Sequence, residues 1–541
     1  MSAFAGVGQL FKLALRRDRL KIPVTIAVLG LLFVAQIGGV ANVYSTEAER
    51  TTYALSASAS PVAMAFNGPV MNTSLGAIAF TELFTFFAIF VGLISTLLVV
   101  RHTRQNEELG RDELLGAGVV GRHAQLGAAL LLAVAVNIAI GIVIALAFTA
   151  YGLDAAGSLL TGCAMSGVGI VFAAIAGITA QLGTTARTAN GLAAISIGAA
   201  FLVRAIGDIQ SHVYANGLGA TSGWLSWLSP MGIARNARPF ADNEWGVLLA
   251  LAVLTGICMY VAFWLADHRD LGAGLFTPRR GRLSAKPSLL NVFGFAWRLQ
   301  RGLLAGWTAA FAILAWTFGA VTKEVGTFME GNEQGTRIVA MLGGSQNLID
   351  AYLSFALMIF GIAVAAYTIQ AMQRLNVEET SGRLELLLAT STSRPVWVVS
   401  HVVVSLLGAA LLLVVSGSIA GLAYGITIGE VWQQTSALLA ACLVYLPVAL
   451  LFAGLVVLLF GTVPRLAIGA SWTIFVASYI ILQFGTILSL PDWLRSTSPF
   501  EHIPRLPAEE LAIAPLWTIT LLALVTIGLG LLAFARRNSS N

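Results

Sequence analysis

Runs of about 20 apolar residues recur along the whole chain, and they constrain its fold more than any other feature. Inside a membrane every backbone N–H and C=O group needs a partner within the protein, so runs of this length cross the bilayer as helices. Of the 541 residues, 57% are hydrophobic and 11% are charged. A water-soluble domain of that composition could not cover its surface with polar side chains. The sequence therefore predicts an all-α, multi-pass membrane protein.

Twelve spans are predicted, six in each half of the chain. Those of the first half cover about 22–43, 77–100, 124–150, 157–182, 189–206 and 246–266. Those of the second half cover about 303–321, 350–372, 396–427, 435–460, 466–489 and 513–535. A basic amphipathic stretch precedes each set, at about 9–21 and 291–301, and is typical of a helix at the inner membrane interface.

Basic residues lie mainly on one side of the predicted spans. Because Lys and Arg are enriched in cytoplasmic loops, their distribution places both termini in the cytoplasm. Only eight of the 31 Lys and Arg residues fall on the outer side: Arg50, Arg204, Arg235, Arg238, Lys323, Arg337, Arg495 and Arg505. The formal charge of +5 thus reflects membrane topology and not nucleic-acid binding.

A short charged motif occurs twice, each time between the second and third span of a half. The copies, at about 104–117 and 376–390, superpose with a shift of 272 positions, which places Gly110 on Gly382. Each copy carries adjacent acids, this glycine, an arginine and a third acid. These residues are Glu107, Glu108, Gly110, Arg111 and Glu113 in the first copy and Glu378, Glu379, Gly382, Arg383 and Glu385 in the second.

The chemistry of this motif suits a contact with another protein. Acids at the start of a short helix are favoured by its positive N-terminal end. The Leu-Leu pair that follows gives an apolar face for a groove on a partner, and Arg383 and Glu385 can set the register through charge-assisted hydrogen bonds. The alternative is an amphipathic loop on lipid headgroups, which the acids disfavour because the inner leaflet is negative.

Two further matches extend the repeat over both halves. The inner loop 183–187 between the fourth and fifth spans matches 461–465, and the Ser-Pro step at 229–230 matches the one at 498–499. Arg187 and Arg465, one in each inner loop, are either a second contact with the partner or plain topology anchors.

Both halves therefore run in the same direction, as a parallel repeat with a pseudo-twofold axis along the membrane normal. A substrate path is expected at the seam between the halves. The predicted organisation is a first half at 1–270, a cytoplasmic linker at 271–290 and a second half at 291–541.

The second copy of the motif, with the arginine that follows it at Arg394, resembles the segment between the second and third spans of ABC-2-type exporter permeases. The whole chain resembles actinobacterial permeases described as tetronasin or polyketide-antibiotic exporters, and the run 269–275 adds to this resemblance. The resemblance implies an elbow helix before each half, a coupling helix after each second span, and short outer re-entrant helices at about 208–240 and 489–510. It also implies efflux of antibiotics, drugs or lipids through a bacterial plasma membrane.

The first copy departs from the family pattern in two respects. It has one residue fewer between its acids and the glycine, and it has Gly116 and Gly118 where the second copy has Leu388 and Thr390. Unequal coupling of the two halves is therefore expected.

The energy source is expected on a separate chain. An ATPase of this class needs a phosphate loop with a Gly-Lys step, and the only lysines here are Lys12, Lys21, Lys286 and Lys323, none of which follows a glycine. With one motif in each half, the expected complex holds two copies of an ABC ATPase, which bind the ATP and Mg²⁺. This chain itself is expected to be no enzyme and to bind no metal or cofactor.

The family resemblance places the substrate path along the second and fifth spans of each half. Aromatic residues at helical spacing there suit a bulky lipophilic ligand, although ordinary core packing gives the same pattern. The predicted path residues are Glu82, Phe84, Phe87 and Phe90 in the first half, with Arg204, and Trp472, Phe475, Tyr479 and Gln483 in the second. Glu82 and Arg204 lie near the outer face, where they pair or line a vestibule. The amides Asn137, Gln181 and Gln370 are further polar groups at membrane depth.

Other functional classes fit the pattern less well. A proton-coupled secondary drug transporter also has twelve spans in two halves, but it needs buried acids in mid-span and has no use for a repeated acidic motif. A polytopic membrane enzyme needs grouped acids in an outer loop, where Glu47 and Glu49 stand alone. A lipid or glycolipid exporter of the same ABC class stays open. The three cysteines lie inside apolar runs without metal-ligand spacing.

Overall fold

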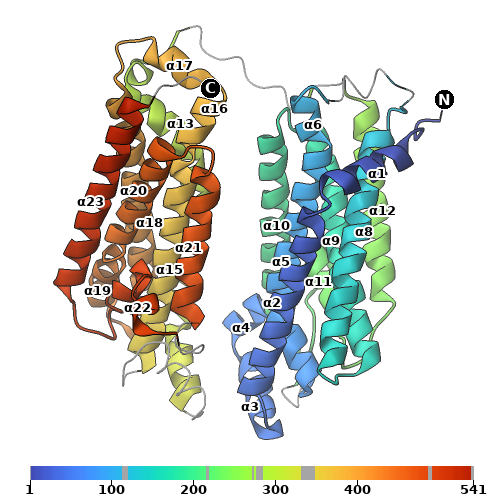
Figure 1. The fold of residues 1–541 in the computed structure, drawn as a ribbon. Coiled ribbons are helices and arrows are strands. Elements are labelled where there is room, and N and C mark those ends of the chain that lie inside the picture. The colour runs from blue at the N-terminus through green and yellow to red at the C-terminus, as the bar shows by residue number, and fades with distance from the viewer. Residues whose placement is uncertain are drawn as a thin grey trace. The chain divides into compact units, whose positions relative to one another are not determined.

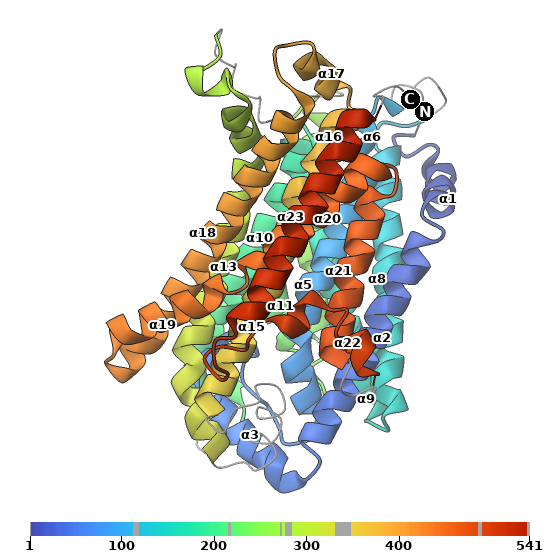
Figure 2. The same cartoon turned by 60° about the vertical axis from the view of Figure 1, so that its left-hand side comes forward.

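The computed structural model of this chain describes residues 2–111, 118, 120–214, 218–270, 273–275, 284–330, 348–484 and 490–537. Within these residues eleven helices are long and apolar enough to cross a membrane, which confirms the all-α polytopic class. The chain divides into two compact units, Met1–Arg280 and Gly281–Asn541, and the boundary falls inside the predicted linker. Figures 1 and 2 show the two units from different sides.

The first unit contains six spans whose bounds lie close to the predicted ones. They are α2 (Lys21–Val43), α5 (Leu75–His102), α8 (Ala124–Ala150), α9 (Ala155–Leu182), α10 (Ala186–Ile209) and α12 (Val247–Asp267). The shorter elements are α1 (Val7–Arg17), α3 (Glu47–Ala59), α4 (Pro61–Phe66), α6 (Arg104–Glu108), β1 (His212–Val213), β2 (Ala220–Thr221), η1 (Trp224–Leu228) and α11 (Pro230–Arg235). In Figure 1, α1 and α6 lie at one end of this unit and α3 and α4 lie at the other.

The second unit is built in the same order. Its long helices are α13 (Val292–Glu330), α15 (Leu348–Met372), α18 (Arg394–Ile428), α19 (Val431–Leu443), α20 (Leu446–Thr462), α21 (Ala467–Phe484) and α23 (Ile513–Arg536). The shorter ones are η2 (Pro287–Leu289), α16 (Arg374–Thr380), α17 (Arg383–Leu388), α22 (Asp492–Arg495) and η3 (Pro499–His502). The predicted span 435–460 is divided into α19 and α20 near Pro447, which has no N–H to continue the helix. Helix α21 is a shorter apolar helix, and residues 485–489 of its predicted span lie outside the described part of the chain.

One prediction is corrected at the start of the second unit. A separate interfacial helix was expected at 291–301, but a single helix of 39 residues, α13, covers both it and the first span. In the first unit α1 and α2 are separate, because Pro23 in the first turn of α2 has no N–H to donate to the preceding turn. The sequence of α13 contains no proline, so its backbone hydrogen bonds continue without a break.

The outer segments before the sixth spans make the same contact in both units. The Ser229 hydroxyl donates to the Ala200 carbonyl of α10 at 2.7 Å, and the Ser498 hydroxyl donates to the Ser478 carbonyl of α21 at 2.9 Å. The acceptors are equivalent, because the shift of 278 positions that aligns the two inner loops also aligns these two residues. The matching contacts support a parallel repeat. The small β1–β2 hairpin in the first of these segments was not predicted from the sequence.

Candidate coupling site and substrate path

The motif of the first unit follows α5 and begins with α6. Glu107 is buried there between Arg104 of α6 and Arg269 just beyond α12, and it forms ion pairs with both. Arg104 also donates to the Gly183 carbonyl of the inner loop at 2.6 Å, and Arg269 donates to the Ala273 carbonyl at 2.9 Å. Glu107 therefore fastens the motif to other parts of its own unit.

The neighbouring residues of this motif are more exposed. The Glu108 carboxylate accepts the backbone N–H of Ala186 at 2.9 Å and so stabilises the positive N-terminal end of α10. Gly110 and Arg111 are exposed. Glu113 lies outside the described residues.

The motif of the second unit consists of α16 and α17. Glu379 forms an ion pair with Arg537 at the end of α23. Glu378 is buried and accepts two hydrogen bonds of 2.9 Å from Nε and Nη2 of Arg383. These hydrogen bonds raise the pKa of the Arg383 guanidinium above its ordinary value. They also fix the orientation of the Arg383 side chain, which is 52% exposed.

The predicted coupling helix at 376–390 is interrupted at Gly382. The backbone φ angle there is 71°, and the equivalent Gly110 has 67°. Glycine adopts this left-handed conformation without strain, and it commonly ends a helix. No atom lies within 4 Å of the position a Cβ would take at either glycine, so the requirement is conformational and not steric. The segment is therefore two short helices joined by a tight turn.

Beyond this turn α17 exposes three residues, Arg383, Glu385 and Leu386, which we call the ridge. Leu386 is 74% exposed, whereas Leu384 on the opposite face is buried in the core of the unit. The described residues of the second unit leave the face of α17 that carries the ridge largely uncovered. A leucine flanked by opposite charges has the composition of a helix that binds in a partner's groove.

Three acids that were predicted to face a partner are thus bonded inside the protein: Glu107, Glu378 and Glu379. The arginines that engage two of them, Arg269 and Arg537, were not among the predicted site residues. The sequence does contain a signal for them, since each follows the sixth span of its half at a similar distance.

The two inner-loop arginines are exposed beside the motifs. Arg187 lies in the first turn of α10, and Arg465 lies two residues before the start of α21. The Asn376 amide donates to the Pro464 carbonyl at 3.0 Å, so the loop that carries Arg465 is bonded to the motif. A protein bound to the motif would meet these arginines as well.

The predicted path residues of α5 divide into buried and exposed side chains. Phe84 and Phe87 are buried in the core of the first unit, and the Phe87 ring lies 4.5 Å from the ring of Phe33, edge to face. Phe90 is 54% exposed on the surface of the unit. Of the three phenylalanines, only Phe90 is therefore placed to meet a ligand without rearrangement of the core.

The path residues of α21 show a similar division. Trp472 and Phe475 are half-buried and pack against each other with their ring planes at 90°, and Phe475 also contacts Phe452 of α20. Tyr479 is exposed, and Gln483 is half-buried. Tyr479 is thus the most accessible of these four side chains.

Glu82 and Arg204 do not pair with each other. Glu82 accepts hydrogen bonds from the Tyr53 hydroxyl and, at 3.2 Å, from the Asn67 amide. Arg204 instead forms a buried ion pair with Asp208, one turn later on α10, at 3.0 Å. Both residues bind the outer segment that contains α3 and α4, since Arg204 also donates to the Ala65 and Phe66 carbonyls.

The other polar groups predicted at membrane depth also have partners within the protein. Asn137 donates to the Ser95 hydroxyl at 2.9 Å. Gln370 accepts from the Trp307 indole at 2.8 Å. Gln181 accepts from an arginine of the loop after α12. These amides therefore join helices of one unit.

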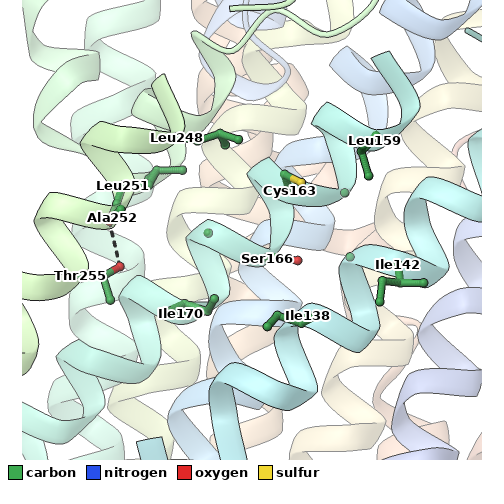
Figure 3. A pocket seen from close by; sticks show the side chains of 13 residues that line it. Ile138, Ile142, Leu159, Cys163, Ser166, Ile170, Leu248, Leu251, Ala252 and Thr255 are labelled. Atoms are coloured by element: carbon green, nitrogen blue, oxygen red, sulfur yellow. Dashed lines mark hydrogen bonds between the residues drawn. The ribbon is translucent and has the colours of Figure 1, made fainter. Parts of the chain in front are cut away.

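A groove of about 400 Å³ opens between α8, α9 and α12 (Figure 3). Its lining is apolar except at Cys163, Ser166 and Thr255, and none of the predicted path residues lines it. Ser166 donates to the Asn137 carbonyl at 2.9 Å and Thr255 to the Leu251 carbonyl at 2.8 Å, so the groove presents mainly hydrocarbon. In the part of the chain that the structure describes, no group of three His, Cys, Asp or Glu side chains could hold a metal ion.

Two comparisons with known proteins find the same kind of protein. Residues 289–535 match the family described as "Multidrug efflux system permease Rv1217c, C-terminal domain". The chain is also 37% identical over 538 residues to the Multidrug efflux system permease protein Rv1217c of Mycobacterium tuberculosis. That similarity covers 99% of this chain and 96% of the relative.

Proposed function

Because the chain belongs to the family of multidrug efflux system permeases, we propose that it is the membrane-spanning subunit of an ABC-2-type exporter that moves amphipathic drugs out of the cell. The similarity to the mycobacterial permease extends over almost the full length of both chains, so it includes both halves of the repeat. The repeated charged motif after each second span supports the ABC-2 type.

The main structural support for an ATPase partner is the ridge on α17. Its leucine is exposed, while the residues beneath it are held in place by Glu378–Arg383 and Glu379–Arg537. A binding surface that is ordered before the partner arrives loses less conformational entropy on binding. The ridge therefore suits a partner that must push on the permease and not only adhere to it.

The stoichiometry follows from the repeat. Each unit carries one motif with a glycine at positive φ, so one permease offers two docking points and would bind two copies of an ABC ATPase. ATP and Mg²⁺ would be held by those copies. Their closure on ATP would displace the motifs and switch the permease between inward-facing and outward-facing states.

This assignment places the motifs, α1 and both chain termini on the cytoplasmic side of a bacterial plasma membrane. The loops between the second and third spans and between the fourth and fifth spans carry most of the basic residues outside the linker and the termini. The ends of the spans to which Arg269 and Arg537 belong would then also face the cytoplasm.

A proton-coupled drug transporter is the second candidate, because Glu82 is a half-buried acid within a span. The two candidates differ in their energy source. Two experiments distinguish the candidates. The protein is purified from native membranes to identify bound partners, and uptake of ethidium and rhodamine 6G into inverted vesicles is measured. An exporter of the ABC type would bring down an ATPase and would transport with ATP in the absence of a pH gradient. Transport that needs only the gradient would favour the second candidate.

Gly382→Ala is expected to weaken coupling moderately. The left-handed backbone conformation costs a residue with a Cβ roughly 1–2 kcal/mol of conformational energy, although no neighbour would clash with that Cβ. The turn would shift, and drug-stimulated ATP hydrolysis by the purified complex should fall severalfold. Gly382→Asn should retain more activity, because asparagine tolerates positive φ. Gly469→Ala, at an open helical position, is the control, and equal effects of the two alanine variants would count against this reading of the turn.

Phe90→Ala is expected to change which drugs are exported without loss of folded protein, because its ring lies largely outside the core. Phe87→Ala should instead destabilise the first unit by about 3–5 kcal/mol, since it removes a buried ring. Resistance profiles of cells that express each variant, with thermal unfolding of the purified proteins, distinguish these results. Leu249→Ala, at a still more exposed position on α12, is the control. A profile identical to that of the unaltered protein would remove Phe90 from the path.

A further inference from the structure

Each unit fastens its motif to the rest of the unit at three equivalent points. The first point is the inner loop between the fourth and fifth spans. Arg104 donates to the Gly183 carbonyl at 2.6 Å, and Asn376, at the equivalent position of the second unit, donates to the Pro464 carbonyl at 3.0 Å. The side chains differ, but both bind a backbone oxygen of the same loop.

The second point joins the motif to the end of the sixth span. Glu107 forms an ion pair with Arg269, and the equivalent Glu379 forms one with Arg537. These four side chains are largely withdrawn from solvent. A charge-assisted hydrogen bond in such a setting is stronger than an exposed one.

The third point is a backbone contact at the same place. Arg122, which follows the first motif, donates to the carbonyls of Asp267 at 2.8 Å and Arg269 at 3.2 Å. Its equivalent Arg394 donates to the Arg537 carbonyl. The last carbonyls of a helix have no partner within the helix, and cations are favoured there. Both sixth spans are thus capped by an arginine that belongs to the loop of the motif.

The repetition of these contacts argues against chance. The partners are separated by 162 residues in the first unit and by 158 in the second, so each pair depends on the whole unit. Because the motif is bonded on both sides of its turn to the end of one span, a displacement of the motif must also displace that span or break the bonds.

We propose that the ion pairs Glu107–Arg269 and Glu379–Arg537 are the links through which the ATPase moves the sixth span of each half. This inference rests on the proposed function. The four residues are positioning residues, because each pair bonds the motif of its own unit to the end of the sixth span and would transmit a movement of that motif without itself binding ATPase or drug. The proposal assigns the sixth span, and not only the second, as an element driven by ATP.

The test uses the permease purified together with its ATPase, with ethidium and rhodamine 6G as drug probes. Glu379→Gln and Arg537→Gln each remove the ion pair, whereas Arg537→Lys keeps the charge. The matched control is Glu501→Gln, which breaks the Arg495–Glu501 ion pair of the same unit, at similar burial but away from the motif. Arg269→Gln is the equivalent variant in the first unit and leaves Glu107 its second partner.

Both glutamine variants are expected to bring down the ATPase and to lower drug stimulation of ATP hydrolysis at least tenfold. The double variant should be no worse than either single one, since all three remove the same link. Arg537→Lys should recover most of the stimulation, and the thermal unfolding temperatures should stay within the range of the control. Normal stimulation in the glutamine variants, an equal loss in Glu501→Gln, or additive losses in the double variant would overturn the proposal. If the unaltered permease brings down no ATPase at all, the proposed function fails first, and that result is distinct from any of these.

Discussion

Leu386→Asp is expected to abolish drug-stimulated ATP hydrolysis while leaving the permease folded in the membrane. The side chain is 74% exposed and contributes little to the unit itself, so the cost to stability should stay within about 0.5 kcal/mol. In the complex the same side chain would lie in an apolar groove, where an unpaired carboxylate is strongly disfavoured. Loss of a central anchor costs roughly 2 kcal/mol or more, which is about a 30-fold weaker complex.

The measurement is the yield of co-purified ATPase, together with drug-stimulated hydrolysis and the thermal unfolding temperature. Leu290→Asp is the matched control, because this leucine is 79% exposed just before α13 and outside the motif. The control should bind the ATPase normally. Normal ATPase binding by Leu386→Asp would show that the ridge is not the docking surface.

Asp208→Asn is expected to cause a large loss of folded protein. The carboxylate is buried, pairs with Arg204 at 3.0 Å, lies 3.9 Å from Arg235, and accepts the Ser226 hydroxyl at 2.6 Å. Without it two buried arginines would lie near each other, and no other acid among the described residues forms an ion pair with either of them. Removing one partner of a buried ion pair typically costs about 3–5 kcal/mol.

The substitution should also weaken the packing of the outer segment, because Arg204 donates hydrogen bonds to the carbonyls of Ala65 and Phe66 at the end of α4. The amount of monodisperse protein after extraction and its thermal unfolding temperature give the result. Asp242→Asn is the control, since that carboxylate is 61% exposed and its pair with Arg238 should be worth little. Equal recovery of the two variants would contradict the assigned role of Asp208.

The spans were predictable because hydrocarbon leaves the backbone no alternative to the helix. The predicted span 124–150 coincides with α8, for example. The separate helix expected before the first span is present in the first unit, where Pro23 lies at the start of α2. In the second unit the same expectation was wrong, because α13 has no proline and continues through the region of the expected helix. Gly382 likewise divides a motif whose charge pattern alone suggested one helix.

The sequence matched the two motifs to each other but did not show which of their acids bond within the protein. Gly110 and Gly382 were matched from sequence, and both have positive φ. The roles of the acids were not predictable in the same way, because Glu107 and Glu379 find arginines far away along the chain. Among the predicted path residues, helical spacing could not distinguish the buried Phe87 from the exposed Phe90.

The sequence by itself determined that this chain crosses a membrane many times and that its two halves repeat, because apolar length and motif spacing are properties of the linear chain. Only the tertiary structure decided which charged side chains remain on the surface. Packing returns the sixth span of each half to the end where the motif lies, and the arginines there neutralise acids that would otherwise face a partner. On α17, Leu386 and its flanking charges stay exposed, since this helix buries only its opposite face.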